Sequence, residues 1–232
     1  MKTTIPKLNL YSIVGLLSLL LLLAATATPL STALAASASE VTNVDQISPL
    51  SDTEIEGILY MREEEKLARD VYLTLYEVWG LPVFENIARS EASHMEAVHT
   101  LIDRYDLVDP AAAEVGVFTD PTLQGLYDQL VADGRTSLAD ALRVGAAIEE
   151  IDILDLQERL AQTDQADIEL VYENLMKGSR NHLRAFVSTL TRQTGETYQP
   201  QYLDPASYES IVNSARETNA GQGQGGGQRG NR

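Results

Sequence analysis

The sequence predicts an all-α protein, a four-helix bundle with a long connection between its second and third helices. Apolar residues recur every three or four positions over most of residues 52–192, the period of helices with one buried face. No run of alternating β-branched residues competes with this period. The four long helical segments are separated by short breaks, except for the connection of residues 106–135. One long connection of this kind is common among four-helix bundles.

The first two helices have clear start and stop signals. The first is predicted over residues 52–79, with Ser51 or Asp52 as its cap and Gly80 at its end. The second is predicted over residues 82–105, because proline is favoured in the first turn of a helix.

The remaining helices follow the long connection. Residues 121–132 within that connection are predicted to form a short accessory helix, because they follow an Asp-Pro step. The third long helix is expected to begin after the Thr-Ser pair at 136–137 and to reach residue 151. A separate short helix is predicted over 154–161, and the fourth long helix over 166–192.

The two ends of the chain differ in composition from this helical domain, which we expect over residues 51–215. Residues 1–38 combine two lysines, an apolar run and two Ala-x-Ala sites, which predicts a cleaved signal peptide. An uncleaved N-terminal anchor is the alternative. Residues 39–50 are predicted to be a linker, and residues 216–232 a disordered Gly-rich tail. We therefore expect an exported protein, secreted or in the cell envelope, without stable membrane insertion after cleavage.

Charge and composition exclude several function classes. The formal net charge of -17 argues against nucleic acid or an anionic membrane as the main partner, because both would repel the chain. The absence of cysteine excludes disulfides, zinc–thiolate sites, iron–sulfur clusters and thiol nucleophiles. No nucleophile with a paired base supports a hydrolase, and no organic cofactor is evident. Chemistry must come from carboxylates, three histidines and hydroxyl groups.

The predicted second helix has two polar residues on its core stripe, which reads Phe84, Ile87, Glu91, His94, Val98, Leu101 and Tyr105. Residues three apart share a helix face, so Glu91 and His94 should point at one place inside the bundle. A buried carboxylate is costly unless it is protonated, paired or bound to metal. Glu-x-x-His on an inward face is the ligand pattern of carboxylate-bridged di-metal bundles. The alternative is a buried Glu–His hydrogen-bonded pair.

The other three long helices each carry one such residue near the middle of an apolar stripe. These residues are Glu65 in the first helix, Glu149 in the third and His182 in the fourth. A single histidine on an apolar face is more often a hydrogen-bonded core residue than a ligand. One polar interruption at the midpoint of every helix nevertheless favours a shared site. The sequence therefore predicts a metal site formed by Glu65, Glu91, His94, Glu149 and His182.

Several neighbouring polar residues have other assignments. Glu64 lies on an adjoining stripe of the first helix and can also turn inward. Asp152 lies three residues beyond a predicted ligand, but it fits equally well as the cap of the short helix that follows. Glu150 and His99 fall off the apolar stripes, so they are expected to face solvent. Glu63 is also expected to face solvent, in a charged turn with local Glu–Arg and Glu–Lys pairs.

Four blocks of sequence carry a family resemblance: MREEEKLARDVY (61–72), IARSEASHMEAV (87–98), GAAIEEIDILDL (145–156) and YENLMKGSRNHLRAF (172–186). Together they resemble the uncharacterised family called domain of unknown function 2202, and the chain is similar to the ferritin-like superfamily over about residues 53–202. The resemblance implies a ferritin-like four-helix bundle. By similarity to bacterioferritins and rubrerythrins, the matching ligand positions are Glu65, Glu91, His94, Glu149 or else Glu150, and His182.

The chain departs from the superfamily pattern at Ser179, where a second Glu-x-x-His would have its glutamate. The carboxylate set is then one short unless Asp152, Glu64, Glu150 or Glu173 completes it. The site would bind two metals asymmetrically, bind one metal, or keep only part of an ancestral site. Without cysteine, the chain also lacks the rubredoxin-like iron centre of rubrerythrins.

These observations favour a metal-binding protein that uses iron or manganese, with zinc as an adventitious occupant. If the protein is an enzyme, we expect a metal-dependent oxidoreductase with ferroxidase activity or with peroxide- or oxygen-reducing activity. Tyr72 would then be a nearby redox or hydrogen-bonding group. The alternative is a metal-free, exported structural or interaction protein with a buried Glu/His polar network. The sequence leaves the oligomeric state open.

Overall fold

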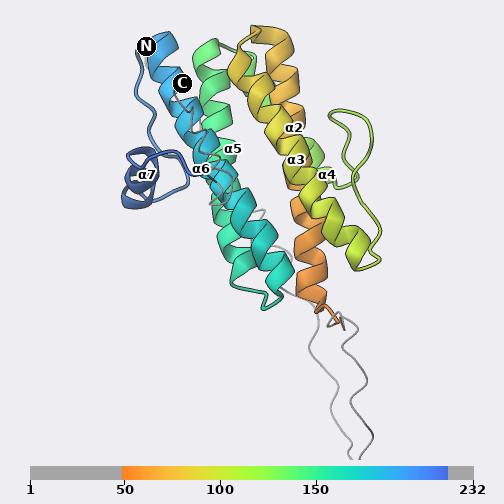
Figure 1. The fold of residues 1–232 in the computed structure, drawn as a ribbon. Coiled ribbons are helices and arrows are strands. Elements are labelled where there is room, and N and C mark those ends of the chain that lie inside the picture. The colour runs from red at the N-terminus through yellow and green to blue at the C-terminus, as the bar shows by residue number, and fades with distance from the viewer. Residues whose placement is uncertain (1–48, 219–232) are drawn as a thin grey trace, which may run out of the picture. The chain divides into compact units, whose positions relative to one another are not determined.

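A computed structural model describes residues 49–218 (Figure 1). This part of the chain contains α-helices and no strand: α2 (Asp52–Trp79), α3 (Pro82–Arg104), α4 (Pro121–Gly134), α5 (Leu138–Leu160), α6 (Ala166–Thr194) and α7 (Pro205–Val212). The predicted signal peptide and nearly all of the predicted linker and tail lie outside the described residues.

Local sequence signals determine the ends of the long helices. Ser51 and Glu54 form a reciprocal capping box at the start of α2, and Gly80 ends the helix in the left-handed conformation with φ 60°. The side chain of Ser137 accepts a hydrogen bond from the backbone N–H of Asp140 at the start of α5. Gly195, with φ 75°, ends α6 as Gly80 ends α2.

The helices pack into a bundle, which confirms the predicted all-α class. α2 packs mainly against α3, and α5 mainly against α6. The two pairs meet where α2 contacts α5 and where α3 contacts α6 (Figure 1). α4 packs on both α2 and α5, whereas α7 packs on α6.

The core consists of two clusters of buried apolar side chains. One includes Leu75, Phe84 and Phe186, and the other includes Met61 and Leu175. Each long helix contributes to both clusters. The polar residues at the helix midpoints therefore lie on stripes whose two ends are anchored in apolar packing.

One prediction about the helices is wrong, and one helix is not among those predicted. Residues 138–160 form one continuous helix, α5, in place of the two separate helices expected. Asp152 and Asp155 interrupt the apolar pattern, but both side chains are buried within this helix. The helix α7 was not predicted, although Asp204 caps it and proline fills its first turn.

The connection between α3 and α4 covers part of α2. The buried ammonium of Lys66 donates to Asp70 at 2.5 Å and to the backbone carbonyls of Glu114 and Val117 at 2.9 and 3.1 Å. Thr119 donates to Glu63 at 3.3 Å. The prediction of a solvent-facing Glu63 is therefore wrong, because the connection shields it.

His99 lies at the surface but is only partly exposed, with 34% of its side chain accessible. Its Nδ1 and Nε2 atoms lie 3.6 Å from the carboxylates of Asp103 and Asp109, respectively. Among the described residues, no helix is long and apolar enough to cross a membrane.

Candidate metal centre

The structure brings the five candidate ligands together in the middle of the bundle. Glu65 of α2, Glu91 of α3 and Glu149 of α5 are at most 2% exposed. His182 of α6 is 8% exposed, and the side chain of His94 on α3 is 12% exposed. Each residue lies on the apolar stripe that directs its side chain inward, so four helices contribute to one buried polar centre.

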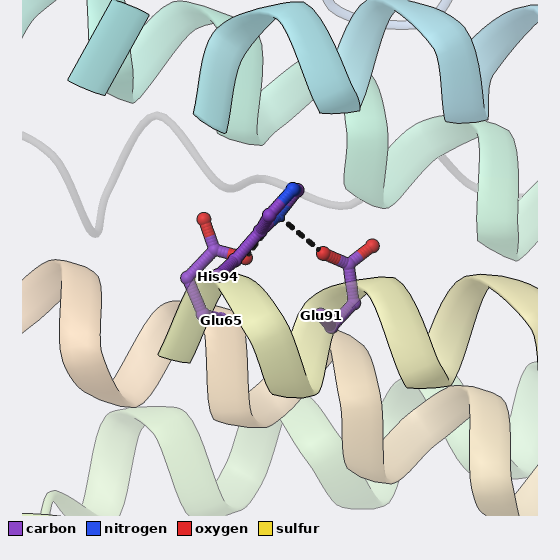
Figure 2. A group of neighbouring side chains, drawn as sticks. All are labelled: Glu65, Glu91 and His94. Carbon is purple, nitrogen blue, oxygen red and sulfur yellow. Dashed lines mark hydrogen bonds and ion pairs between the residues drawn. The ribbon is translucent and has the colours of Figure 1, made fainter. Parts of the chain in front are cut away.

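The first half of this centre consists of Glu65, Glu91 and His94. One ligand atom from each residue lies within 4.8 Å of the others. Nδ1 of His94 is 3.1 Å from Oε2 of Glu65 and 2.7 Å from Oε2 of Glu91. Figure 2 shows the imidazole between the two carboxylates.

The second half consists of Glu91, Glu149 and His182, which meet the same 4.8 Å limit. Nδ1 of His182 is 2.9 Å from Oε1 of Glu91 and 3.4 Å from Oε2 of Glu149. Glu91 thus belongs to both halves and directs one oxygen toward each imidazole. This is the arrangement expected of a carboxylate that bridges two metal ions.

The outward-facing sides of the two imidazoles have different neighbours. Nε2 of His182 lies 2.9 Å from Oγ of Ser90. His94 lies so close to Gly178 of α6 that an added Cβ there would be 2.5 Å from its Nε2 atom. The two rings stack with centroids 5.4 Å apart. Sequence reasoning missed Ser90 and Gly178, because neither lies on the polar pattern that identified the ligands.

Tyr72 of α2 extends the centre into the apolar core. Its hydroxyl group donates to Oε1 of Glu149 at 2.6 Å and also lies 3.3 Å from the carbonyl oxygen of Gly145. The other oxygen of Glu149 remains directed toward His182. Tyr72 therefore fixes the orientation of a candidate ligand, as hydrogen-bond partners of metal ligands do.

The carboxylates of the centre have different proton affinities. Burial raises the pKa of Glu65 to about 7, against the opposing attraction of His94. Burial also raises the pKa of Glu149 to about 6, against the attraction of His182. Burial favours the neutral form of Glu91 as well, but His182 and His94 outweigh it and lower the pKa of Glu91. The shared carboxylate is therefore the one that stays ionised most readily.

The imidazoles provide the positive charge of the metal-free centre. Burial opposes their protonation, but Glu65 and Glu91 raise the pKa of His94 well above its ordinary value. Glu91 and Glu149 raise the pKa of His182 to about 10 against the same opposition. A metal ion at this centre would have to displace these protons, because imidazole binds metals in its neutral form.

Unpaired buried atoms show that the residues fit a metal ion. Oε1 of Glu65, Oε1 of Glu91 and Nδ1 of His182 form no hydrogen bond within the described part of the chain. The last two lie 2.9 Å apart, but outside hydrogen-bond geometry. Buried polar atoms without partners are costly. Carboxylate oxygen and imidazole nitrogen together suit iron and manganese.

Ser179, where the resemblance to ferritin-like proteins would place a glutamate, belongs to a buried polar pair. Ser179 of α6 is completely buried and donates a short hydrogen bond to Oδ2 of Asp152. Asp152 lies within α5, so the alternative assignment of this residue as a helix cap is wrong. Its other oxygen, Oδ1, is buried without a hydrogen-bond partner. A buried carboxylate from α5 thus lies beside the position where the superfamily pattern has a glutamate on α6.

The three other glutamates that could complete the ligand set each have different surroundings in the structure. Oε2 of Glu150 accepts hydrogen bonds from three successive backbone N–H groups, at residues 201–203. The prediction of a solvent-facing Glu150 is wrong, because the segment after α6 covers it. Glu173 is exposed. Glu64 is buried, and the charges that act most strongly on it are those of Asp155 and Asp152.

Comparisons with known proteins place this geometry in a family context. The sequence profile described as "Uncharacterized protein domain (DUF2202)" matches residues 54–215. The "Uncharacterized protein MJ0754" of Methanocaldococcus jannaschii is 53% identical over 170 residues, which span 73% of this chain and 91% of that protein.

A solved structure is also similar. The "Crystal structure of hypothetical protein MJ0754 from Methanococcus jannaschii DSM 2661" matches with a TM-score of 0.72 at 50% sequence identity. The match covers 77% of this chain and 100% of that one.

Proposed function

This chain belongs to the DUF2202 family of uncharacterized protein domains, and we propose that it is a metal-binding protein. Its centre holds one or two ions of iron or manganese. The ligands in this proposal are Glu65, Glu91, His94, Glu149 and His182.

The observation that carries the proposal is the position of Glu91 between two ligand groups. Each group offers two carboxylates and one imidazole, and the two groups have Glu91 in common. Its oxygens lie 2.7 and 2.9 Å from the two histidines. Two neighbouring groups that share a carboxylate favour a two-ion centre over a single-ion centre.

We infer that the bundle is ferritin-like. Two observations support this inference. The candidate ligands come one or two from each of α2, α3, α5 and α6, and Glu91 and His94 form an inward-facing Glu-x-x-His pair. Ser179 remains the departure from the ferritin-like pattern, and Asp152 provides a buried carboxylate beside it.

The residues around the centre define what it can do. Bound iron or manganese would supply one-electron redox chemistry, which suits oxidation of Fe(II) or reduction of oxygen or peroxide. Tyr72 and Ser90 orient Glu149 and His182 by hydrogen bonds. The two apolar clusters lie on either side of the centre along the bundle. We propose a metal-dependent oxidoreductase on this basis.

We also propose that the protein is exported. The support is the sequence of residues 1–38, which lie outside the described residues: two lysines, an apolar run and two Ala-x-Ala sites. N-terminal sequencing of native protein should give a start near residue 36 or 39. Recovery of Met1 or Lys2 would indicate a retained anchor.

One observation favours a metal-free protein with a buried polar network. The two histidines already pair with the three carboxylates, at distances of 2.7 to 3.4 Å. Such a network would hold the bundle together without an ion. The unpaired oxygen of Glu65 and the out-of-geometry contact between Glu91 and His182 count against it.

Metal analysis of the full chain tests the proposal. The protein is purified without an affinity tag, and its metal content is measured before and after reconstitution with Fe(II) or Mn²⁺ under anaerobic conditions. One or more ions bound per chain would support the metal centre. No bound ion after reconstitution would favour the metal-free network.

A further inference from the structure

A second group of buried carboxylates lies on the interface between α2 and α5, outside the five candidate ligands. It consists of Glu64 on α2 and of Asp152 and Asp155 on α5, with exposed fractions of 6%, 6% and 8%. We call these three residues the acidic seam. The proposed metal centre does not account for Glu64 or Asp155.

The contacts between α2 and α5 order the seam along the bundle. Tyr72 contacts Gly145 and Glu149 near the centre, whereas Tyr60, three turns earlier on α2, donates to Asp155 at 3.2 Å. The two helices therefore run antiparallel. Glu64 and Asp152 must lie between these two contacts, so the seam leads from the centre toward the start of α2.

The inner end of the seam adjoins the centre. Besides burial, the charges of Glu65 and Glu149 act most strongly on Asp152 and raise its pKa well above the ordinary value. Farther out, burial and the charges of Asp155 and Asp152 raise the pKa of Glu64 in the same way. Burial and these neighbouring charges favour the protonated forms of Asp152 and Glu64 in the metal-free chain, so a cation that enters the seam would displace their protons.

Two atoms of the seam have no partner. Oε2 of Glu64 and Oδ1 of Asp152 are buried and accept no hydrogen bond within the described residues. Asp70, a buried carboxylate elsewhere on α2, is instead paired with Lys66, Arg69 and the backbone N–H of Gly116. The seam has only two hydroxyl donors among the bonds described, Tyr60 to Asp155 and Ser179 to Asp152. Neither reaches the two unpaired oxygens, which a cation would satisfy.

Arg159 connects the outer end of the seam with a pocket, because it acts on Asp155 and also lines the pocket. Residues that line this pocket include Gly57, Arg159 and Thr163. The guanidinium carbon of Arg159 lies 5.2 Å from the ring centre of Tyr60, and Nη2 lies 3.9 Å from the exposed carboxylate of Glu56. A positive side chain thus stands where the seam approaches the surface.

We propose that the acidic seam is the route by which divalent cations reach the metal centre. Arg159 marks its outer end, and cations pass from Asp155 to Glu64 and Asp152 before they reach the centre. Within the described residues, the seam does not form a compact group of three ligands like the two halves of the centre. It is therefore suited to transit and less suited to tight binding. This inference rests on the proposed metal-binding function.

The rate at which metal enters tests the route. Co²⁺ is mixed with the metal-free full chain in a stopped-flow instrument, and the visible absorption of the bound ion is followed. Asp155→Asn should slow association by roughly three- to tenfold, because one attractive charge is lost along the path. The amount of Co²⁺ bound at equilibrium should not change. Asp155→Glu, which keeps the charge, should behave like the parent.

Two further variants separate the route from general electrostatics and from misfolding. Arg159→Gln should accelerate association, because it removes a repelling charge. If Asp155→Asn does not fold, the association rate of Arg159→Gln tests the route in its place. Glu96→Gln removes an exposed charge on α3 and should leave the rate unchanged.

Three results would overturn the inference. If Co²⁺ associates with Asp155→Asn and with Arg159→Gln at the parent's rate, the route is contradicted but the proposed function is not. The same conclusion follows if Glu96→Gln slows association as much as Asp155→Asn does. A parent that binds no Co²⁺, Fe(II) or Mn²⁺ at equilibrium would contradict the proposed function and the route together.

Discussion

The hydroxyl group of Tyr72 and Oε1 of Glu149 lie 2.6 Å apart across the interface between α2 and α5. Both residues are at most 1% exposed, so no water competes for this contact. The hydrogen bond leaves Oε2 of Glu149 directed at His182. One tyrosine thus connects the apolar core to the polar centre.

Tyr72→Phe should weaken both the fold and the metal centre. It leaves one oxygen of Glu149 without its donor, at a cost of about 1–3 kcal/mol in the free energy of unfolding. Metal affinity should fall as well, because Glu149 is no longer held in place. Urea unfolding and metal titration measure the two effects. Tyr76→Phe, on the partly exposed face of α2, is the control. Equal stability of the two variants would contradict a structural role for this bond.

Ser90→Ala should lower metal affinity by about tenfold without removing a ligand. Nε2 of His182 lies 2.9 Å from Oγ of Ser90. In the neutral tautomer with the proton on Nε2, this nitrogen donates to Ser90 and Nδ1 is the metal-binding atom. Isothermal titration with Mn²⁺ measures the change. Ser93→Ala on the same helix is the control, because its hydroxyl bonds only to the backbone carbonyl of Arg89 in the described structure. An unchanged affinity in Ser90→Ala would show that the serine does not orient the imidazole.

Gly178→Ala should weaken metal binding for a steric reason. The added methyl group would lie 2.4 Å from Cε1 of His94 and would force the ring to move. Gly125→Ala in α4 meets nothing within 4 Å. It should stabilise the protein by about 0.5–1 kcal/mol through helix propensity alone. Equal gains in thermal stability for both variants, with metal affinity unchanged, would contradict the close packing of His94.

The stability of the metal-free protein should fall as the pH rises from about 5 to 9. The folded-state pKa values of Glu65 and Glu149, about 7 and 6, exceed the ordinary 4.5, so folding favours their protonated forms. The stabilisation that comes from the protonated forms of Glu65 and Glu149 is complete below pH 4.5. It is lost as the pH rises through their folded-state pKa values. His182, raised from 6.5 to about 10, adds a loss at higher pH. The lowered pKa of Glu91 matters only in more acidic solution.

Metal should act in the opposite direction over the same range. Its affinity should increase with pH, because the ligands must release protons to bind it. Thermal melting at several pH values, with and without Mn²⁺, measures both trends. A metal-free protein that becomes more stable between pH 5 and 8 would contradict the assigned proton affinities.

The sequence predicts most of the helices because their signals are local. The bounds of α2 match the expected residues 52–79, since its cap and its terminal glycine are both adjacent to it. The candidate ligands were identified because each interrupts an apolar stripe near its middle. The structure brings these five residues within reach of one another. Whether they bind metal stays a prediction.

The missed features depend on contacts between distant segments. Glu63 and Glu150 are buried by chain that lies more than 50 residues away, around Thr119 and residues 201–203. Asp152 and Asp155 face a neighbouring helix, so their polarity gave a false break in α5. Periodicity within one helix cannot identify such a partner, because it reports only which positions share a face.

Removal of the shared carboxylate tests the metal centre most directly. Thermal midpoints are measured for the parent, Glu91→Ala and the exposed control Glu96→Ala, each without metal and with saturating Mn²⁺. Glu91→Ala should melt lower even without metal, because it removes the ion pairs to both histidines.

The decisive quantity is therefore the rise in thermal midpoint that metal produces, which measures binding to the folded state. We predict a rise for the parent and for Glu96→Ala, and little or none for Glu91→Ala. Equal rises in all three proteins, or no rise in the parent, would contradict a metal centre built around Glu91.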